Sequence, residues 1–428
     1  MPASPSLLIV PARFKTGKLY TQIATTSAGV VLGSSGDFNV TRATTATRFN
    51  SAGLIESVAS GVPRLDYYTS GGTAGCPALL VEPSAQNSAL QSQDFTTTWS
   101  PTNVTVSANV TGTTDPFGTN LADLLTATAS GSARVVQTFG FVSGTTYTYS
   151  CFAKAGNGFF GMTMENGGIA SGVAVIWNVS TGAFSVSGSV GSGYTLQAHN
   201  IENYGNGWYR CSMRVLLGLS VTGNIRVNTS NGTMSSVVVQ SDNGNSVNVF
   251  GAQVETGSIA TSYIPTTTAS GTRNADVITL SGAVSGCIGQ TEGTMYAEVD
   301  IRNLTDGRIL TLFKTSAQYI LLSKSTNRLG GAIIDTTSSP TTVVNLQTAS
   351  GSLTSGIYKL ALAYKQNDFA FYVNGTQVGT SNSGNVIGDY SLIRIGNFDT
   401  SLFFNDRIRA AALYTTRLTD AELQALTT

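Results

Sequence analysis

The stretch GAQVETG at residues 251–257, followed by SYIP at residues 262–265, decides the architecture of this chain. It has the form of a last β-strand, a stop and an extended spacer. Pro265 lacks a backbone donor and pushes Ile264 towards extended geometry, so a strand cannot continue through it. A new β-pattern begins with RNADVI at residues 273–278. The sequence therefore predicts a junction between two β-domains near Pro265.

The composition predicts β-structure on both sides of this junction. Only 11% of the 428 residues are Asp, Glu, Lys or Arg, against about 25% in an average soluble protein. The 47 glycines suit turns and disfavour helix interiors. With 41% hydrophobic residues, 18 Phe and 16 Tyr, the chain can bury cores, which excludes wholesale disorder. We expect an all-β protein of two or three domains.

Charge and hydropathy exclude several classes of partner. The 23 Lys and Arg balance the 23 Asp and Glu, and no basic block provides the concentrated positive surface that nucleic-acid binding needs. The apolar run from Leu7 to Val10 is shorter than the roughly 7–15 residues of a signal-peptide core. No apolar run approaches the roughly 20 residues of a membrane span. We expect no nucleic-acid partner, no membrane insertion and no secretion signal.

The cysteines are Cys76, Cys151, Cys211 and Cys287, and no two of them are close in sequence. This spacing excludes the common zinc and redox motifs. Cys151 and Cys211 alternate with apolar residues on expected strands, so we expect both to face inward as reduced core thiols. A disulfide between these two remains geometrically feasible.

Residues 1–87 form a first segment of short strands broken by Gly and Pro. Arg42, Arg48 and Arg64 stand out in this charge-poor chain, and we expect them to pair with carboxylates or carbonyls rather than with a ligand. The segment is short for a self-sufficient core, so we expect it to dock on a neighbour or a symmetry mate.

Residues 88–265 form a second segment of regularly spaced, half-buried strands, which predicts a sandwich. In residues 145–154, for example, Tyr147 and Tyr149 alternate with threonines and Ser150. The motifs around Trp99, DPFG at residues 115–118 and GWYR at residues 207–210 resemble those of carbohydrate-binding-module jelly rolls.

Residues 266–428 form a third segment with clear alternation in residues 294–302 and 357–364. Asn374-Gly375 predicts a tight hairpin. Thr419 and Glu422 predict the capping box of a short C-terminal helix. The whole pattern resembles a laminin-G or concanavalin-like jelly roll, a family that binds glycans or proteins and often serves as a spacer. The expected fold is therefore all-β, with tandem jelly-roll sandwiches after a small N-terminal β-rich attachment segment and with a short C-terminal helix.

Catalytic and metal-binding patterns are missing from the sequence. His199 is the only histidine and no Gly-x-Ser-x-Gly elbow is present, so we expect a surface or packing role for it rather than a triad. Asp115, Asp242 and Asp306 lie in expected loops but lack the spacing of a calcium loop. We expect no enzyme, no cofactor and no obligatory metal. A glycosidase stays open, because it needs only two suitably placed carboxylates.

Sugar binding usually requires accessible aromatic rings. Trp177 shares parity with apolar neighbours, so we expect it in a core. Trp208 shares parity with Arg210, which places it on a polar face. Tyr194 and Tyr204 lie in Gly- and Asn-rich stretches that favour ligand contact. The candidate ligand-binding residues are therefore Trp208, Tyr194 and Tyr204.

The junction around Pro265 and the motif order of residues 1–87 resemble structural proteins of tailed bacteriophages, of the tail-fibre, head-fibre or spike type. This resemblance implies a homotrimeric virion protein that is assembled in the host cytoplasm, attaches to other virion proteins through its first segment and presents lectin-like domains for weak multivalent contact with host-surface glycans. Two alternatives are a capsid decoration protein without specific sugar binding and a polysaccharide-degrading enzyme.

Overall fold

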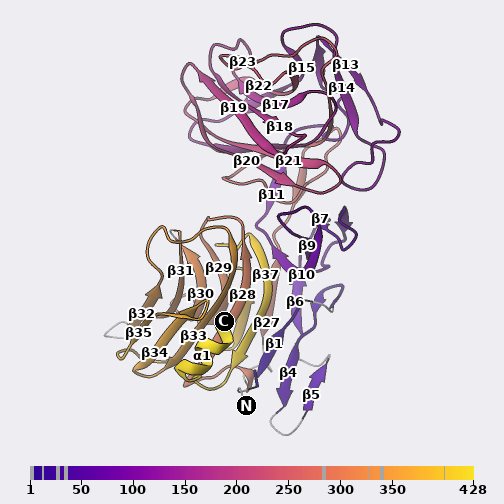
Figure 1. Ribbon diagram of the computed structural model, residues 1–428. Helices are drawn as coiled ribbons and strands as arrows, with labels where there is room; N and C mark the ends of the chain where they lie inside the picture. The colour runs from indigo at the N-terminus through magenta and orange to yellow at the C-terminus, as the bar shows by residue number, and fades with distance from the viewer. Residues whose placement is uncertain are drawn as a thin grey trace.

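The computed structural model describes residues 4–11, 14–25, 29–32, 37–281, 286–325, 327–337, 342–399 and 401–428. It confirms the all-β prediction: the described chain forms antiparallel sheets and one helix, α1 (Asp420–Thr427). Figure 1 shows two bodies stacked on each other, with both ends of the chain at the lower one. Helix α1 starts with the expected capping box, in which Thr419 and Glu422 exchange hydrogen bonds. No described helix is long and apolar enough to cross a membrane.

The lower body consists of two large sheets packed around one core. Along the first sheet the described strands are β35 (Thr376–Ser381), β34 (Asp368–Val373), β33 (Gly356–Lys365), β28 (Glu292–Ile301), β37 (Asp406–Tyr414), β1 (Leu7–Ile9), β4 (Gln22–Thr25) and β5 (Gly29–Leu32), with β10 (Ala74–Val81) beside β37 and β9 (Leu65–Tyr68) beside β10. Along the second they are β2 (Phe14–Lys15), β3 (Lys18–Leu19), β6 (Phe38–Thr41), β27 (Val277–Ser281), β36 (Leu392–Ile395), β29 (Gly307–Thr315), β30 (Gln318–Ser325), β31 (Arg328–Asp335) and β32 (Thr342–Gln347).

Strands from both ends of the chain build this body together. Strand β1 pairs with β37 through Leu7 and Leu413, and β6 pairs with β27 through Val40 and Ile278. Their apolar side chains lie in the same core as those of the third segment, because each sheet alternates core-facing and outward-facing positions. The neighbour on which residues 1–87 dock is therefore the C-terminal part of their own chain.

The upper body is a sandwich of two six-stranded sheets. One contains, in order, β12 (Ser100–Thr102), β15 (Ala133–Phe141), β22 (Val221–Ser230), β17 (Phe159–Glu165), β18 (Gly172–Asn178) and β19 (Ala183–Val190). The other contains β13 (Val104–Ser107), β14 (Asp123–Ala127), β25 (Ser246–Thr256), β16 (Thr146–Ala155), β21 (Trp208–Leu217) and β20 (Tyr194–Asn203). A small hairpin of β23 (Met234–Ser235) and β24 (Val238–Val239) packs on the outer side of β18.

The core between these two sheets contains the residues that the sequence assigned to it. Trp177 is fully buried, as predicted. Cys151 and Cys211 lie directly opposite each other on β16 and β21, and both are buried and free. Burial raises the pKa of the Cys151 thiol to about 12, which suits an inert packing residue.

Two antiparallel connections join the bodies, so the upper sandwich is inserted between two halves of the lower one. Strand β11 (Ala85–Asn87) leads up, β26 (Gly271–Arg273) leads back, and the two pair with each other. Strand β25 ends before Pro265 and β27 begins after Asp276, as the sequence predicted for this stretch. A hairpin of β7 (Ala46–Phe49) and β8 (Ile55–Val58) lies beside the connection (Figure 1).

A buried network of charges lies where the segments meet. Arg64 pairs with Asp276 and, at 2.6 Å, with Glu82. Arg42 pairs with Asp276 at 2.9 Å, and Arg273 pairs with Glu82 at 3.0 Å. Each of these side chains is almost completely excluded from solvent. Because buried charges require partners, this network fixes the first segment against the start of the third.

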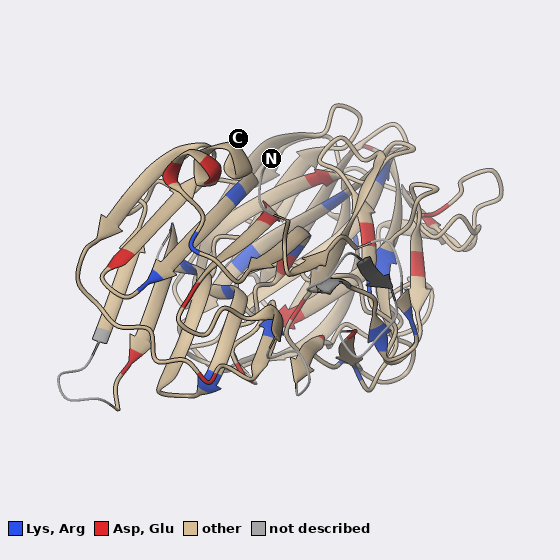
Figure 2. Cartoon of the chain, turned by 90° about the horizontal axis from the view of Figure 1, so that it is seen from below, with Lys and Arg blue, Asp and Glu red and all other residues tan. Residues whose placement is uncertain are grey.

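The network also includes the end of the upper body. The Ser262 amide and hydroxyl donate to the Glu82 carboxylate at 2.8 and 2.6 Å. Arg48 pairs instead with Glu56 across the β7–β8 hairpin. The structural role expected for Arg42, Arg48 and Arg64 is confirmed. Charged residues make up only 11% of the chain, and Figure 2 shows the two signs interspersed over the described residues.

Removal of one carboxylate from the network should strongly destabilise the protein. The substitution Glu82→Gln leaves Arg64 and Arg273 with one buried carboxylate fewer, which costs about 3–5 kcal/mol of unfolding free energy. Denaturant unfolding would measure this loss. The matched control is Glu56→Gln, which removes a partly exposed ion pair and should cost about 1 kcal/mol or less. Equal losses of unfolding free energy in the two variants would contradict the stabilising role assigned to the buried network.

Candidate functional site

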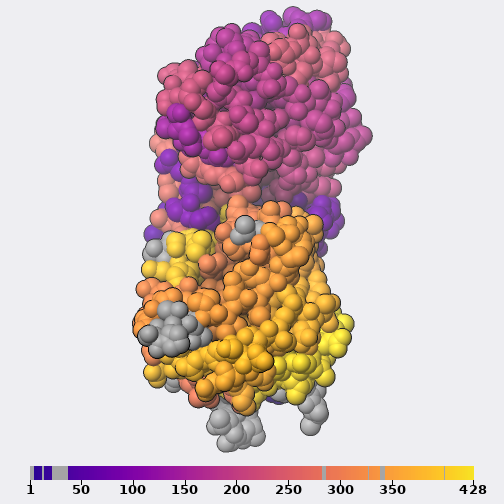
Figure 3. Space-filling view, turned by 90° about the vertical axis from the view of Figure 1, so that its left-hand side faces the viewer, coloured from indigo at the N-terminus to yellow at the C-terminus, as the bar shows by residue number. Residues whose placement is uncertain are grey.

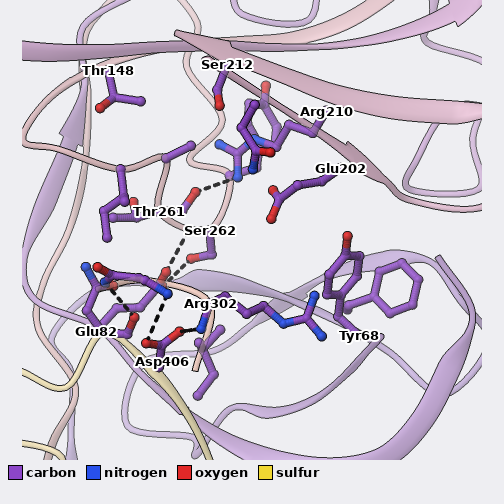
Figure 4. A pocket seen from close by; sticks show the side chains of 18 of the residues that line it. Tyr68, Glu82, Thr148, Glu202, Arg210, Ser212, Thr261, Ser262, Arg302 and Asp406 are labelled. Atoms are coloured by element: carbon purple, nitrogen blue, oxygen red, sulfur yellow. Dashed lines mark hydrogen bonds between the residues drawn. The ribbon is translucent and has the colours of Figure 1, made fainter. Parts of the chain in front are cut away.

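A cleft with a volume of about 240 Å³ lies at the joint between the two bodies. Its lining comes from all three segments of the chain: strands β20 and β21 above, the loop of residues 258–263 at the side, and residues around Tyr68, Arg302 and Arg407 below. Figure 4 shows these groups surrounding a common space. In Figure 3, which looks onto the side where β19 and β20 lie in Figure 1, the chain narrows to a waist between the bodies.

The upper surface of the cleft is the outer face of β20 and β21. The register places Glu202 opposite Arg210, Asn200 opposite Ser212, and Ala198 opposite Arg214. Intervening residues such as Met213 face the sandwich core, since successive side chains on a strand point to opposite faces. Alternation along the two strands therefore directs a polar set into the cleft.

Four of these polar side chains are unpaired. Asn200, Glu202, Ser212 and Arg214 make no side-chain hydrogen bond and no salt bridge to any other described residue. The Arg214 Nε is buried and has no partner among the described residues. Figure 4 shows Glu202 projecting from its strand towards the space above Arg302 and Tyr68. The cleft therefore offers donors and acceptors together on a regular two-stranded surface.

The lower wall is held by cation–π contacts around one ring. The Arg302 guanidinium lies 4.5 Å from the centroid of the Tyr68 ring, and the Arg407 guanidinium lies 5.3 Å from it. Arg407 also donates through Nε to Asp66 at 2.7 Å, and Arg302 pairs with Asp300 at 3.0 Å. Because both arginines have carboxylate partners, this wall is ordered before any ligand binds.

The side wall is closed by the loop that follows β25. Arg210 donates to the Thr261 carbonyl at 2.6 Å and to the Ser150 hydroxyl at 3.0 Å. The Thr261 amide in turn donates to Glu255 at 2.8 Å. Burial raises the pKa of Glu255, in spite of the nearby Arg210. The loop therefore covers the β16 and β25 side of the sheet and leaves the β20–β21 face open.

Most of the carboxylates that line the cleft are ion-paired. Asp66, Glu82 and Asp406 are engaged in ion pairs, and Glu202 is the one lining carboxylate outside such a pair among the described residues. Asp406 accepts from Lys324 at 2.6 Å and from the Arg302 amide at 2.9 Å, and burial raises its pKa to about 6.

The described residues contain no group of three or more side chains that could hold a metal ion. Asp115, one of the acidic loop residues in the sequence, has a structural task instead. Its carboxylate accepts from the amides of Phe117, Thr119 and Leu121 and so closes a tight turn.

The structure places the three predicted ligand-binding residues differently. Trp208 lies on the outer face of its sheet, as its parity predicted, but its exposed fraction is only 1% and its Nε1 donates to the Thr114 carbonyl at 2.7 Å. Tyr194 is also buried, at 5%, and packs on Phe141. Solvent-facing rings at these two positions are thus a wrong expectation. Tyr204 is half-buried and lines the cleft.

The physical reason is the cover supplied by the first segment. Phe49, Ile55 and Tyr68 of that segment form a cluster with Trp208 and Phe152 on the outer face of the upper sheet. Sequence parity identifies the polar face but does not reveal that a distant segment covers half of it. For the same reason the sequence did not identify Asn200, Ser212 and Arg214 as candidate ligand-binding residues. Their alternation in step with Trp208 marks the polar face of the sheet. Only the position of the covering segment shows which half of that face stays open.

His199 lies at the rim of the cleft and is exposed. Its ring stacks on Phe184, with ring centroids 4.1 Å apart and an interplanar angle of 13°. This geometry agrees with the surface or packing role expected from the sequence. Partial burial of the ring lowers the pKa of His199 below its usual value of 6.5, which favours the neutral imidazole.

Comparisons with family models and with curated protein sequences gave no match. Among solved structures, the CBM40 module of the Ruminococcus gnavus IT-sialidase bound to α2,6-sialyllactose is similar at a TM-score of 0.28 and 15% identity, over 33% of this chain and 85% of that one. Domain 4 of AbnA, a GH43 arabinanase from Geobacillus stearothermophilus, is similar at a TM-score of 0.30 and 17% identity, over 36% of this chain and 73% of that one. A botulinum neurotoxin type C structure is similar at a TM-score of 0.29 and 14% identity, over 36% of this chain and 39% of that one. Similarity this low does not indicate what the present chain binds.

Acid should weaken the joint that holds the cleft together. Burial acts to raise the pKa of Glu82, but Arg273, Arg64 and the contacts with Ser262 lower it far below its usual value. The unfolded chain, with a Glu pKa of about 4.3, therefore takes up this proton at higher pH than the folded one. The stabilisation is complete above about pH 4.3 and is lost as the pH falls towards the folded-state pKa.

Unfolding free energies of the wild type and Glu82→Gln, measured between about pH 3 and 7, would test this. The difference between the two proteins should shrink as the pH falls. Asp406 acts in the opposite sense, because its raised pKa makes its contribution fall as the pH rises from about 4 to about 6. Its effect is present in both proteins and cancels in the difference. A difference that does not vary with pH would contradict the assignment.

The single histidine permits a second pH measurement. An NMR titration of the His199 imidazole should give a pKa below 6.5, because the ring is partly buried against Phe184. Phe184→Ala should move this pKa back towards 6.5. An unchanged pKa in the variant would show that the stacking does not cause the burial.

Proposed function

We propose that this chain is a glycan-binding structural protein of a tailed-phage virion and that the cleft at the joint is its binding site. The observation that carries the glycan part is the set of unpaired side chains on the β20–β21 face: Asn200, Glu202, Ser212 and Arg214. These residues line a cleft whose other walls are held by internal contacts.

The chemistry of this set fits a polyhydroxylated ligand. A sugar hydroxyl both donates and accepts, and the set combines an acceptor-only carboxylate, a donor-only guanidinium, and an amide and a hydroxyl that do both. The buried Arg214 Nε has no partner among the described residues, and an unpaired buried donor is costly, so a ligand that pairs with it is favoured. The volume of about 240 Å³ lies below the roughly 300–1,000 Å³ of pockets for drug-sized ligands, which fits a single sugar unit.

One small polar site binds weakly, so function would depend on many copies. In a homotrimer, and in many trimers on one particle, the second and later contacts become intramolecular and raise the avidity. The virion location and the trimer follow from the resemblance of the Pro265 junction and of residues 1–87 to phage appendage proteins. Attachment through the first segment would then occur at the lower body, into which that segment is built.

We further propose that the cleft does not hydrolyse its ligand. Glu202 is the one lining carboxylate without an ion pair among the described residues, and the second carboxylate that a glycosidase requires would have to leave an arginine or lysine partner.

The test is glycan binding by cleft variants. Asn200→Ala and Ser212→Ala should each weaken binding about 2- to 10-fold, the value of one hydrogen bond, and Arg214→Ala about 10-fold or more, the value of one charged hydrogen bond. Thr222→Ala, an exposed change on the other sheet of the upper body, should have no effect. A glycan array would find the ligand, and calorimetry and blocking of virion adsorption would measure the losses.

Binding that is insensitive to all three cleft substitutions would overturn the assignment of the site. Failure of the purified oligomer to bind any glycan or host surface would overturn the glycan part of the proposal. A capsid or tail protein without sugar specificity would then be the better description.

A further inference from the structure

Among the Phe, Tyr and Trp side chains of the described residues, only Phe184 is exposed, with an exposed fraction of 44%. It lies on β19, and its stacking partner His199 lies on β20. These are the edge strands of the two sheets of the upper sandwich. The pair therefore joins the two edges, and the Phe184 ring stays partly open to solvent.

The pair also has a structural task. Phe184 is opposite Trp177 in the register and His199 is opposite Met213, so both rings lie on the side of the sandwich core and cover its open edge. Such a cover does not require an exposed aromatic ring, because a smaller apolar side chain could also close the gap. The exposed part of the Phe184 ring stays accessible to a ligand.

Through His199, the Phe184 ring lies next to the cleft. His199 lines the cleft, and its neighbours on β20, Ala198 and Asn200, face into it. The aromatic surface is thus continuous with the polar surface around the edge of one strand. Burial also lowers the pKa of His199, which favours the uncharged imidazole.

We propose that Phe184, supported by His199, is a second subsite that stacks the sugar unit next to the one held in the cleft. The ligand would then be an oligosaccharide of at least two units. One unit forms hydrogen bonds with Asn200, Ser212 and their neighbours, and the next lays the C–H face of its ring on Phe184. A pyranose has such a face between polar rims, which matches an aromatic ring beside a polar cleft. This inference rests on the proposed function.

The experiment uses the full chain, labelled with ¹³C and ¹⁵N on its one histidine. The probes are lactose, cellobiose, maltose and N,N′-diacetylchitobiose together with their component monosaccharides. The imidazole signals of His199 report on the second subsite, and calorimetry reports the affinity of each sugar. In the wild type, at least one disaccharide should bind about 3- to 10-fold more tightly than its monosaccharide, the range expected for one aromatic contact, and should shift the imidazole signals.

Two substitutions isolate the ring. Phe184→Ala removes it, and Phe184→Leu keeps an apolar cover over the core edge if the alanine variant fails to fold. In either folded variant the disaccharide advantage should disappear, while the monosaccharide affinity stays as in the wild type. The matched control is Ser189→Ala, an exposed change on the same strand, which should leave both affinities unchanged.

The outcomes separate this inference from the proposed function. An unchanged disaccharide advantage in Phe184→Leu, or imidazole signals that do not shift on binding, would overturn the second subsite and leave the cleft intact. No binding of any probe by the wild type would overturn the proposed function and the inference together. Loss of the advantage in the Phe184 variants alone would support the inference.

Discussion

The buried network of Arg64, Asp276 and Glu82 is the constraint on which the rest of the structure depends. Arg42 and Arg273 complete it, so three cations share two carboxylates away from solvent. Loss of Asp276 would leave Arg42 without a carboxylate partner, and loss of Glu82 would do the same to Arg273, so each carboxylate is needed to keep the buried arginines paired. A buried ion-pair network adds little net stability over well-packed apolar residues, but its hydrogen bonds and charge pairs form in one relative position of the segments only.

The fixed position of the segments around this network also forms the walls of the cleft. Glu82 lies in the network and at the cleft wall, and it accepts two hydrogen bonds from Ser262 in the loop that closes the side. A second contact, between Asp66, Arg407 and Tyr68, ties the first segment to the last strand of the lower body. The cleft surfaces are therefore positioned by contacts that exist without ligand, which reduces the ordering cost of binding.

Much of the fold was predictable because it is written locally. Alternation identified strands such as β28 and β33, the Asn374-Gly375 pair identified a hairpin, and Thr419 with Glu422 identified the start of α1. Pairing of Arg42 and Arg64 with carboxylates was also predictable, since a charge-poor chain has few other uses for them. The site was not. Trp208 had the correct parity, but Phe49 and Tyr68 cover it from a segment about 150 residues away.

The sequence by itself determined the all-β class, the strands with their inward and outward faces, the stop near Pro265 and the cap of α1. These depend on near neighbours and on a period of two, which one chain segment contains completely. Only the tertiary structure decided that β1 and β6 complete a sandwich with β37 and β27, and that half of the polar β20–β21 face stays open. Strand partners and surface cover depend on packing between distant segments, and a local pattern contains no record of what will lie on it.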